Sequence, residues 1–162
     1  EPDLVVLGNG LANGEPAAAV VGRADLIDAL TYGEASDTFS GNPHACAAVC
    51  ATLDVFDKEN AVANCRAIAK VIGEKMCAAM GTFSFIKDVR GEGLVYGIEM
   101  ADDATAQRAV LEAYRGVNGK GVHFLGPLAG KVLLVGPPLT ITKGDLDEAF
   151  GILDTALARL GG

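Results

Sequence analysis

Positive charge is scarce in this sequence of 162 residues. Thirteen lysines and arginines stand against 21 aspartates and glutamates, which gives a net charge of −8. No lysine precedes Lys58, and residues 1–50 carry seven acidic side chains against one basic side chain, Arg23. Nucleic acids and anionic membrane surfaces both require clustered cations. We therefore expect neither a nucleic-acid partner nor a membrane partner.

Long hydrophobic runs are also missing. No apolar stretch reaches the roughly 18 residues that a membrane-spanning helix needs. Apolar residues nevertheless make up 50% of the chain, and the mean hydropathy is +0.31. This composition favours a folded protein with a sizeable core over a disordered one. At about 100–200 residues per domain, the length fits one domain, or one domain and a piece of another.

Several common site motifs are absent. The glycine-rich loop at 8–14 matches neither the dinucleotide-binding pattern nor a phosphate-binding P-loop, and there is no nucleophile elbow. His44, Cys46 and Cys50 lack a second ligand pair at zinc spacing, so we expect no metal site. The four cysteines lie in apolar, helix-like stretches, which predicts reduced core thiols in a cytoplasmic protein.

The first third of the chain alternates apolar runs with polar loops. Residues 4–7 and 17–21 are apolar on both faces, as in strands of a parallel sheet that helices cover. A short helix is predicted over 24–30. Asn42 followed by Pro43 is a typical helix start, and this helix should continue to about residue 57.

The remainder mixes helices and strands. An apolar stripe predicts a helix over 59–80, and two strands at 83–89 and 94–100 should form a hairpin. The other elements expected there are a helix at 105–114, short strands at 122–125 and 132–135, and a helix at about 143–160 that Thr142 caps. This order predicts a small α+β layer.

The residues alone leave the candidate sites open. The segment 37–43 precedes a helix start, where free N–H groups favour an anion such as phosphate, but the residues alone favour ordinary capping by Ser40 or Asn42. His44 and His123 lack a nucleophile and base beside them, so both are expected to be structural or exposed. Arg90 fits an ion pair better than a substrate clamp.

Read in order, five segments resemble the class III aminotransferases, the ω-type enzymes that depend on pyridoxal phosphate (PLP). The matching segments are PDLVVLG at 2–8, GLANG at 10–14, TFSGNPHACAA at 38–48, DVRGEGL at 88–94 and GPPLTIT at 136–142. The resemblance implies an α/β protein of fold-type I and a homodimer. Residues 1–57 would end the mixed or parallel sheet of the large domain, and residues 58–162 would form the small α+β domain.

The resemblance also assigns site residues. The family's Schiff-base lysine follows the strand at 4–7, and Asn9 stands at that position here. A carboxamide is neither nucleophilic nor basic, so covalent attachment of PLP at Asn9 is ruled out. Thr38, with the backbone of Phe39, matches the family segment that contacts the cofactor phosphate across the dimer.

The family's substrate-binding arginines are not visible. Neither the residues before Pro137 nor Gly126 before Pro127 supplies an arginine for a carboxylate. The cofactor-binding residues that the family carries upstream of this region are also outside the sequence. A mainly apolar pocket for an amine is the resulting expectation.

We therefore expect a portion of an enzyme that moves an amino group from an amine or amino acid to a keto acid or aldehyde, inactive as written. Two alternatives remain open. Racemases, aminomutases and a decarboxylase share the fold. A chain without the lysine could instead be a non-catalytic module that associates with itself or with a full-length homologue.

Overall fold

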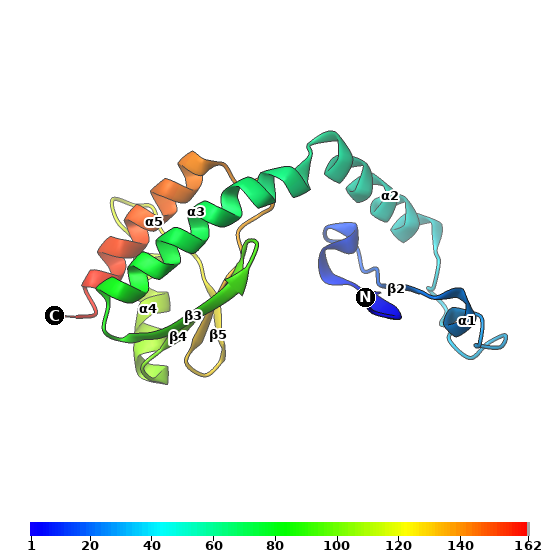
Figure 1. Ribbon diagram of the computed structural model, residues 1–162, viewed down its shortest axis with the longest axis horizontal. Coiled ribbons are helices and arrows are strands. Elements are labelled where there is room, and N and C mark those ends of the chain that lie inside the picture. Colours follow the sequence, from blue (N-terminus) through cyan, green and yellow to red (C-terminus); the bar gives the residue numbers. More distant parts are fainter. Residues whose placement is uncertain (162) are drawn as a thin grey trace. The chain divides into compact units, whose positions relative to one another are not determined.

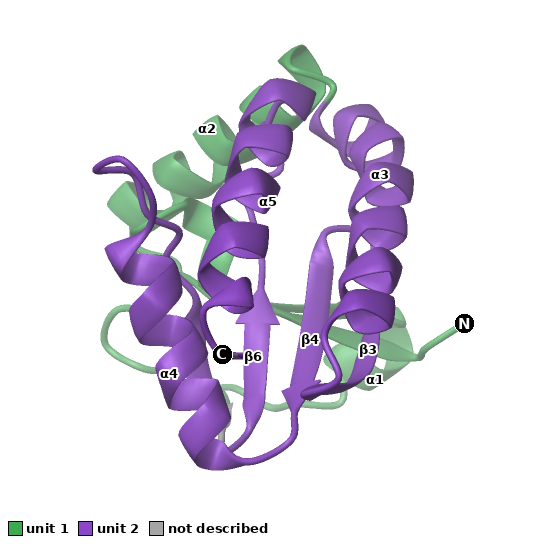
Figure 2. Cartoon of the chain, turned by 90° about the vertical axis from the view of Figure 1, so that its left-hand side faces the viewer, with its two compact units in different colours: residues 1–60 green, residues 61–162 purple. Residues whose placement is uncertain are grey.

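The computed structural model describes residues 1–161, apart from the side chains of Leu128 and Ala129. It divides the chain into two compact units (Figure 2): unit 1 is Glu1–Asn60 and unit 2 is Ala61–Gly162. No helix within the described residues is long and apolar enough to cross a membrane.

Unit 1 contains two short strands and one long helix (Figure 1). Its elements are β1 (Leu4–Leu7), the 3-10 helix η1 (Asn9–Ala12), β2 (Ala19–Gly22), α1 (Ala24–Ile27) and α2 (Pro43–Lys58). The two strands form an antiparallel ribbon in which Leu4 lies opposite Gly22. Arg23 bonds Asp3 and Asp25 at the end of this ribbon, at 3.0 and 2.7 Å.

The parallel arrangement expected for these two strands is wrong. The loop between Leu7 and Ala19 returns the chain beside β1, so the strands run in opposite directions. A continuous apolar run shows that both faces of a strand suit burial, but it carries no information about strand direction. Both strands are also mostly exposed, with Val6 at 77%.

Unit 2 is a four-stranded antiparallel sheet with helices on one face (Figure 2). Its elements are α3 (Ala61–Thr82), β3 (Ile86–Glu92), β4 (Val95–Met100), α4 (Asp103–Arg115), β5 (Leu125–Ala129), β6 (Val132–Val135) and α5 (Lys143–Ala158). The strand order is β3-β4-β6-β5, and the predicted β3–β4 hairpin is confirmed. The strand expected at 122–125 instead begins at Leu125 and continues past Pro127, which an edge strand tolerates.

Two glycines shape the β3–β4 hairpin. A Cβ atom on Gly91 would lie 2.2 Å from the carbonyl oxygen of Val95, so only glycine lets the strands approach here. Gly93 has a φ of 62°, which side-chain-bearing residues rarely adopt. The glycines of this motif are thus explained by the backbone of the hairpin.

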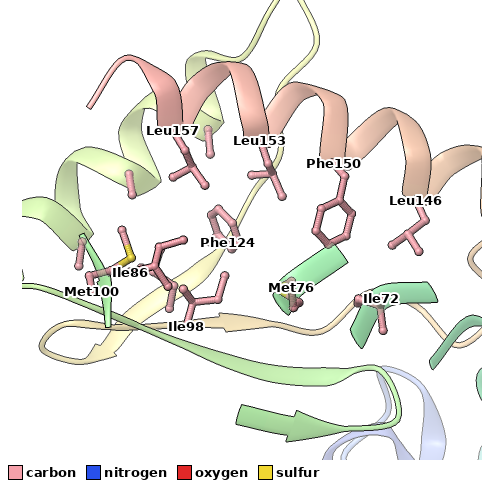
Figure 3. Packing of buried hydrophobic residues seen from close by; sticks show 14 of the residues in the cluster. Ile72, Met76, Ile86, Ile98, Met100, Phe124, Leu146, Phe150, Leu153 and Leu157 are labelled. Carbon is pink, nitrogen blue, oxygen red and sulfur yellow. The ribbon is translucent and has the colours of Figure 1, made fainter. Parts of the chain in front are cut away.

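One hydrophobic core holds unit 2 together (Figure 3). Leu146, Phe150, Leu153 and Leu157 form a stripe on α5 that faces Ile72 and Met76 of α3 and the inner face of the sheet. The stripe predicted for the last helix is therefore confirmed. The predicted cap of this helix is also confirmed, because the Thr142 hydroxyl accepts a bond from the Asp145 amide in a reciprocal capping box.

The cysteines depart from the expected core position. Cys46, Cys50 and Cys77 are exposed, and only Cys65 is partly buried against the core of unit 2. All four are unpaired. The expectation failed for α2 because the apolar residues of that helix meet no packed layer within unit 1, where Ala12 is the one buried hydrophobic residue.

Candidate functional site

Asn9 lies directly after β1 and opens the short helix η1. Gly8 before it is extended, and Asn9 itself has a left-handed φ of 50°, which asparagine tolerates better than most residues. The residue is exposed. Chain geometry therefore presents position 9 to solvent, where its amide can donate and accept hydrogen bonds but cannot act as a nucleophile or base.

The side-chain amine of unit 1 lies far along the chain from Asn9. The single lysine of unit 1, Lys58, ends α2 and pairs with Asp54 one turn earlier at 3.2 Å. This is an exposed pair within one helix. Lys58 lies at the far end of α2, well removed from Asn9 in sequence, and it already has a carboxylate partner.

Thr38 and Phe39 lie in an exposed turn that Asp37 organises. Oδ1 of Asp37 accepts a hydrogen bond from the Phe39 amide at 2.8 Å, and Oδ2 accepts one from the Ser40 hydroxyl at 2.7 Å. The Ser40 hydroxyl and then the Phe39 amide lower the pKa of Asp37 below its ordinary value. The ionised carboxylate of Asp37 thus already accepts hydrogen bonds from two donors that an external anion would otherwise use.

The start of α2 is capped from within the chain. The Asn42 side chain accepts a bond from the Ala45 amide at 2.9 Å and donates one to the Phe39 carbonyl at 3.0 Å. Pro43, at the first helical position, has no N–H to offer. Of the two explanations for segment 37–43, capping is therefore the one that this arrangement shows, with Asn42 as the cap and Ser40 bonded to Asp37.

A groove of about 490 Å³ lies beside this turn within unit 1. Its lining is mostly apolar and includes Leu11, Ala17, Phe39, Cys46, Val49 and Cys50. Phe39 is thus the one predicted site residue that contributes to the groove, since Asn9 and Thr38 are not among its lining residues. The groove brings the loop after β1 together with α2.

His44 and Arg90 have structural partners. Nδ1 of His44, in the first turn of α2, lies 3.6 Å from the carboxylate of Glu15 in the loop before β2. Arg90 bonds Asp88 at 2.6 Å and Glu99 at 2.9 Å on the sheet of unit 2. Arg90 is therefore held as an ion-pair partner, as its sequence context favoured.

Asn64 is a structural contact that the sequence did not reveal. Its side-chain amide donates to the carbonyls of Leu139, at 2.6 Å, and Ile141, at 3.2 Å, and so fixes the segment 136–142 on α3. The one hint of this contact in the sequence is that Asn64 is a single amide in an otherwise apolar helical stripe. Its partners are backbone carbonyls 75 and 77 residues away, which no side-chain pattern can show.

These residues do not fit a covalently held aldehyde cofactor. Position 9 carries an amide, and no other residue of unit 1 supplies a free amine there. For a phosphate group, the exposed Thr38 hydroxyl is a suitable donor, but the neighbouring Asp37 carboxylate and the net charge of −6 over residues 1–50, from seven acids and one base, oppose it. Cations other than those of residues 1–50 would be needed for tight binding.

A family model described as aminotransferase class-III matches residues 1–157. The chain belongs to the class III aminotransferases. These are PLP-dependent enzymes, and the arrangement of helices and strands is that of fold-type I. An amine transaminase from an uncultivated Pseudomonas species, solved in its PLP-bound form, matches with a TM-score of 0.87 at 27% identity, over 99% of this chain and 39% of that one.

The curated relatives of this class III chain are much longer than the chain itself. It is 33% identical to a probable 4-aminobutyrate aminotransferase of Bacillus subtilis, over 96% of this chain and 37% of the relative. It is also 33% identical to a leucine/methionine racemase of Thermococcus litoralis, over 98% of this chain and 36% of the relative. The chain thus spans little more than a third of the length of these relatives.

Proposed function

We propose that this chain is the C-terminal portion of a PLP-dependent class III aminotransferase. The whole protein would move an amino group from an amine or amino acid to a keto acid or aldehyde. The observation that carries the proposal is the family match across residues 1–157, in a chain that spans 37% of a relative's length. The free cysteines favour a cytoplasmic location.

The two units suggest how the chain is divided. We propose that residues 1–57 end the large cofactor-binding domain and that residues 58–162 form the small domain. In support, residues 61–161 have a core of their own, whereas nearly every apolar side chain of residues 1–60 is at least partly exposed. A segment that normally belongs to a larger sheet would have this character.

In this proposal Asn9 occupies the position of the lysine that binds the cofactor. Its amide cannot form the covalent bond to an aldehyde, and it cannot take a proton from a substrate carbon. Thr38 would donate its hydroxyl to the cofactor phosphate across a homodimer, beside the Phe39 backbone. The chain alone would then hold PLP weakly at most, and it would not transfer amino groups.

The test is a transaminase assay on the purified chain with PLP, a panel of amine and amino acid donors, and keto acid acceptors. We expect no product above a protein-free control. Product formation that scales with protein concentration would refute the proposed inactivity. A Thr38→Val variant, compared with Thr31→Val as a control on another exposed threonine, should weaken PLP retention only when a full-length homologue is present.

A racemase is a second candidate for the whole protein. The Thermococcus relative named as a leucine/methionine racemase is as similar to this chain as the probable aminotransferase of Bacillus. Residues 1–162 therefore do not distinguish amino transfer from racemisation. Assaying the complete protein with a single amino acid enantiomer, with and without a keto acid acceptor, would separate the two reactions.

A non-catalytic association module is the third candidate. The exposed apolar ribbon of β1 and β2 favours it, because such a surface is normally covered. Co-expression with an intact homologue should then give a complex that survives gel filtration. A strictly monomeric chain that retains no homologue would contradict this function.

A further inference from the structure

A tight turn between α4 and β5 holds an asparagine beside a glycine. Asn118 and Gly119 are both exposed, and their φ values of 52° and 79° are typical of a type I′ turn. The amide of Val117 donates to the carbonyl of Lys120 at 2.8 Å, and the amide of Lys120 donates back to the carbonyl of Val117 at 3.0 Å. These closing bonds use the flanking residues, so the peptide between Asn118 and Gly119 takes no part in them.

The base of this turn is anchored within unit 2. A Cβ atom on Gly116 would lie 1.8 Å from the carbonyl oxygen of Lys120, so two segments of the chain pass each other closely there. The carbonyl of Gly116 accepts a bond from Arg159 at 3.1 Å, and Lys120 pairs with Glu148 of α5. The turn is therefore held at its base by its own unit, while its tip is exposed.

The central peptide of such a turn can flip while the turn stays closed. A type II′ turn differs from type I′ mainly in ψ of its first central residue, which is about −120° instead of about 30°. The flip also reverses the sign of φ at the second central residue, which Gly119 permits because glycine takes either sign. At a ψ of about −120° the nitrogen of Gly119 turns to the Cβ side of Asn118, within reach of its side-chain amide carbon.

We propose that Asn118 is a site of spontaneous deamidation in the folded chain. The nitrogen of Gly119 loses its proton to hydroxide and attacks Cγ of Asn118. The N–Cγ bond forms, the Cγ–Nδ2 bond breaks, and the leaving nitrogen takes a proton from water and departs as ammonia. Water then opens the cyclic imide at either carbonyl, which gives aspartate or isoaspartate at position 118. No electron is transferred, and water is the co-reactant.

The products should change the connection between α4 and β5. Either product adds a negative charge two residues before Lys120, which pairs with Glu148. Isoaspartate also routes the main chain through the side-chain CH₂ group, so the two-residue turn becomes longer and cannot keep both bonds between Val117 and Lys120. The modification uses neither Asn9 nor Thr38, so it stands apart from the proposed enzymatic function.

Asn64 provides an internal comparison in the same unit. It lies within α3, and its side-chain amide donates to the carbonyls of Leu139 and Ile141. The helix fixes the peptide that follows Asn64, so the next nitrogen cannot turn toward the side chain. Asn9 and Asn13 also precede glycine, but they begin and cap the helix η1 of unit 1. The proposal concerns the turn of unit 2.

The experiment follows the folded chain at neutral and at mildly alkaline pH over several days. Peptide mass spectrometry with electron-transfer fragmentation separates asparagine, aspartate and isoaspartate at position 118. We expect a growing mixture of aspartate and isoaspartate there, formed faster at the higher pH because the nitrogen of Gly119 must lose its proton. Asn118→Gln should keep its amide, because the ring that it would have to close is one atom larger.

A matched control separates the geometry of the turn from the Asn-Gly sequence. Cys65→Gly gives Asn64 the same following residue as Asn118, but inside α3 and with its amide already hydrogen-bonded. In the folded variant Asn64 should convert at least about tenfold more slowly than Asn118, which corresponds to about 1.4 kcal/mol in the barrier. In guanidinium chloride the two asparagines of this variant should convert at similar rates.

The unsubstituted chain supplies a second measurement in case circular dichroism shows that Cys65→Gly has lost its fold. Asn118 of the folded chain should convert at no less than about a tenth of its rate in guanidinium chloride. An Asn118 that keeps its amide in the folded chain while it converts in the denatured chain would overturn the proposal. Conversion of Asn64 as fast as that of Asn118 in folded Cys65→Gly would do the same.

Discussion

Strands in the two units have similar apolar sequences but opposite surroundings. In unit 2, Leu133 of β6 (VLLV) is 1% exposed beneath helices, whereas in unit 1 Val6 of β1 (LVVL) is 77% exposed. Each buried side chain of this size contributes about 1.5–3 kcal/mol of stability. Unit 2 therefore contains the interactions that fold it, and unit 1 contains apolar surface that still requires a cover.

The interactions that unit 1 does have are weak ones. Arg23 pairs with Asp3 and Asp25 at the surface, and exposed ion pairs contribute at most about 1 kcal/mol each. Helix capping by Asn42 adds a comparable amount. Local order in unit 1 thus comes from turns, caps and one ribbon, and the difference between the units can be measured directly.

The largest expected difference is in hydrogen exchange. Amides of β4 and β6 should exchange only on global unfolding of unit 2, at least about a thousandfold more slowly than those of β1 and β2. Mass spectrometry of peptides covering 4–22 and 95–135 measures both in one experiment. Equal protection in a monomeric chain would mean that unit 1 is stable by itself, contrary to this comparison.

The next largest difference is expected in the free energy of unfolding when one apolar side chain is truncated in each unit. Leu133→Ala removes a side chain that is 1% exposed and should lower the free energy of unfolding by about 2–5 kcal/mol. Val6→Ala removes exposed atoms and should change it by less than about 0.5 kcal/mol. Urea denaturation followed by circular dichroism gives both values, and a large loss for Val6→Ala would show that β1 is packed.

Helix caps offer a smaller, paired test. Asp102 caps α4 in unit 2 by accepting a bond from the Thr105 amide at 2.7 Å, and Asn42 caps α2 in unit 1. Asp102→Ala should lower the unfolding free energy by about 1 kcal/mol. Asn42→Ala should instead speed exchange within α2 and leave the denaturation midpoint unchanged. A midpoint shift for Asn42→Ala would contradict the independence of unit 2.

The smallest effect concerns acid stability. Lys131 and then Arg90 lower the pKa of Glu99 below its ordinary value of 4.5 in the folded chain. A lowered carboxyl pKa stabilises the fold above that ordinary value, and the stabilisation disappears as the pH falls through the lowered pKa.

Denaturation midpoints measured from about pH 6 to about pH 3 should therefore fall less steeply in Glu99→Gln than in the unsubstituted chain. The matched change in unit 1 is Asp37→Asn, since the pKa of Asp37 is also lowered. Asp37→Asn should leave the pH dependence of the denaturation midpoint unchanged. The midpoint reports unfolding of the core of unit 2, and Asp37 lies in unit 1, which has no such core. Parallel curves for Glu99→Gln and the unsubstituted chain would exclude this contribution.

Sequence patterns predicted unit 2 much better than unit 1. The stripe of α5 specified both the helix and its buried face, because leucines at helical spacing meet helices and a sheet in the same unit. The apolar runs of β1 and β2 specified strands but not their direction or their exposure. Those properties depend on neighbouring layers that residues 1–60 do not provide.

The candidate site was predictable only in part. Motif order identified positions 9, 38 and 39, and Asn42 followed by Pro43 located the start of α2. The contacts of Asp37 with the Phe39 amide and of Asn64 with two distant carbonyls were not predictable. Both involve backbone groups, whose positions follow from the folded chain and leave no mark in side-chain patterns.

Reduction of an equimolar mixture of the chain and PLP with borohydride tests the central claim most directly. Peptide mass spectrometry then locates any stable pyridoxyl group. The account predicts that no single residue of the unsubstituted chain carries a stoichiometric pyridoxyl group. A stoichiometric pyridoxyl group on a single lysine of the unsubstituted chain would contradict it, because the chain would then have a covalent anchor that Asn9 does not supply.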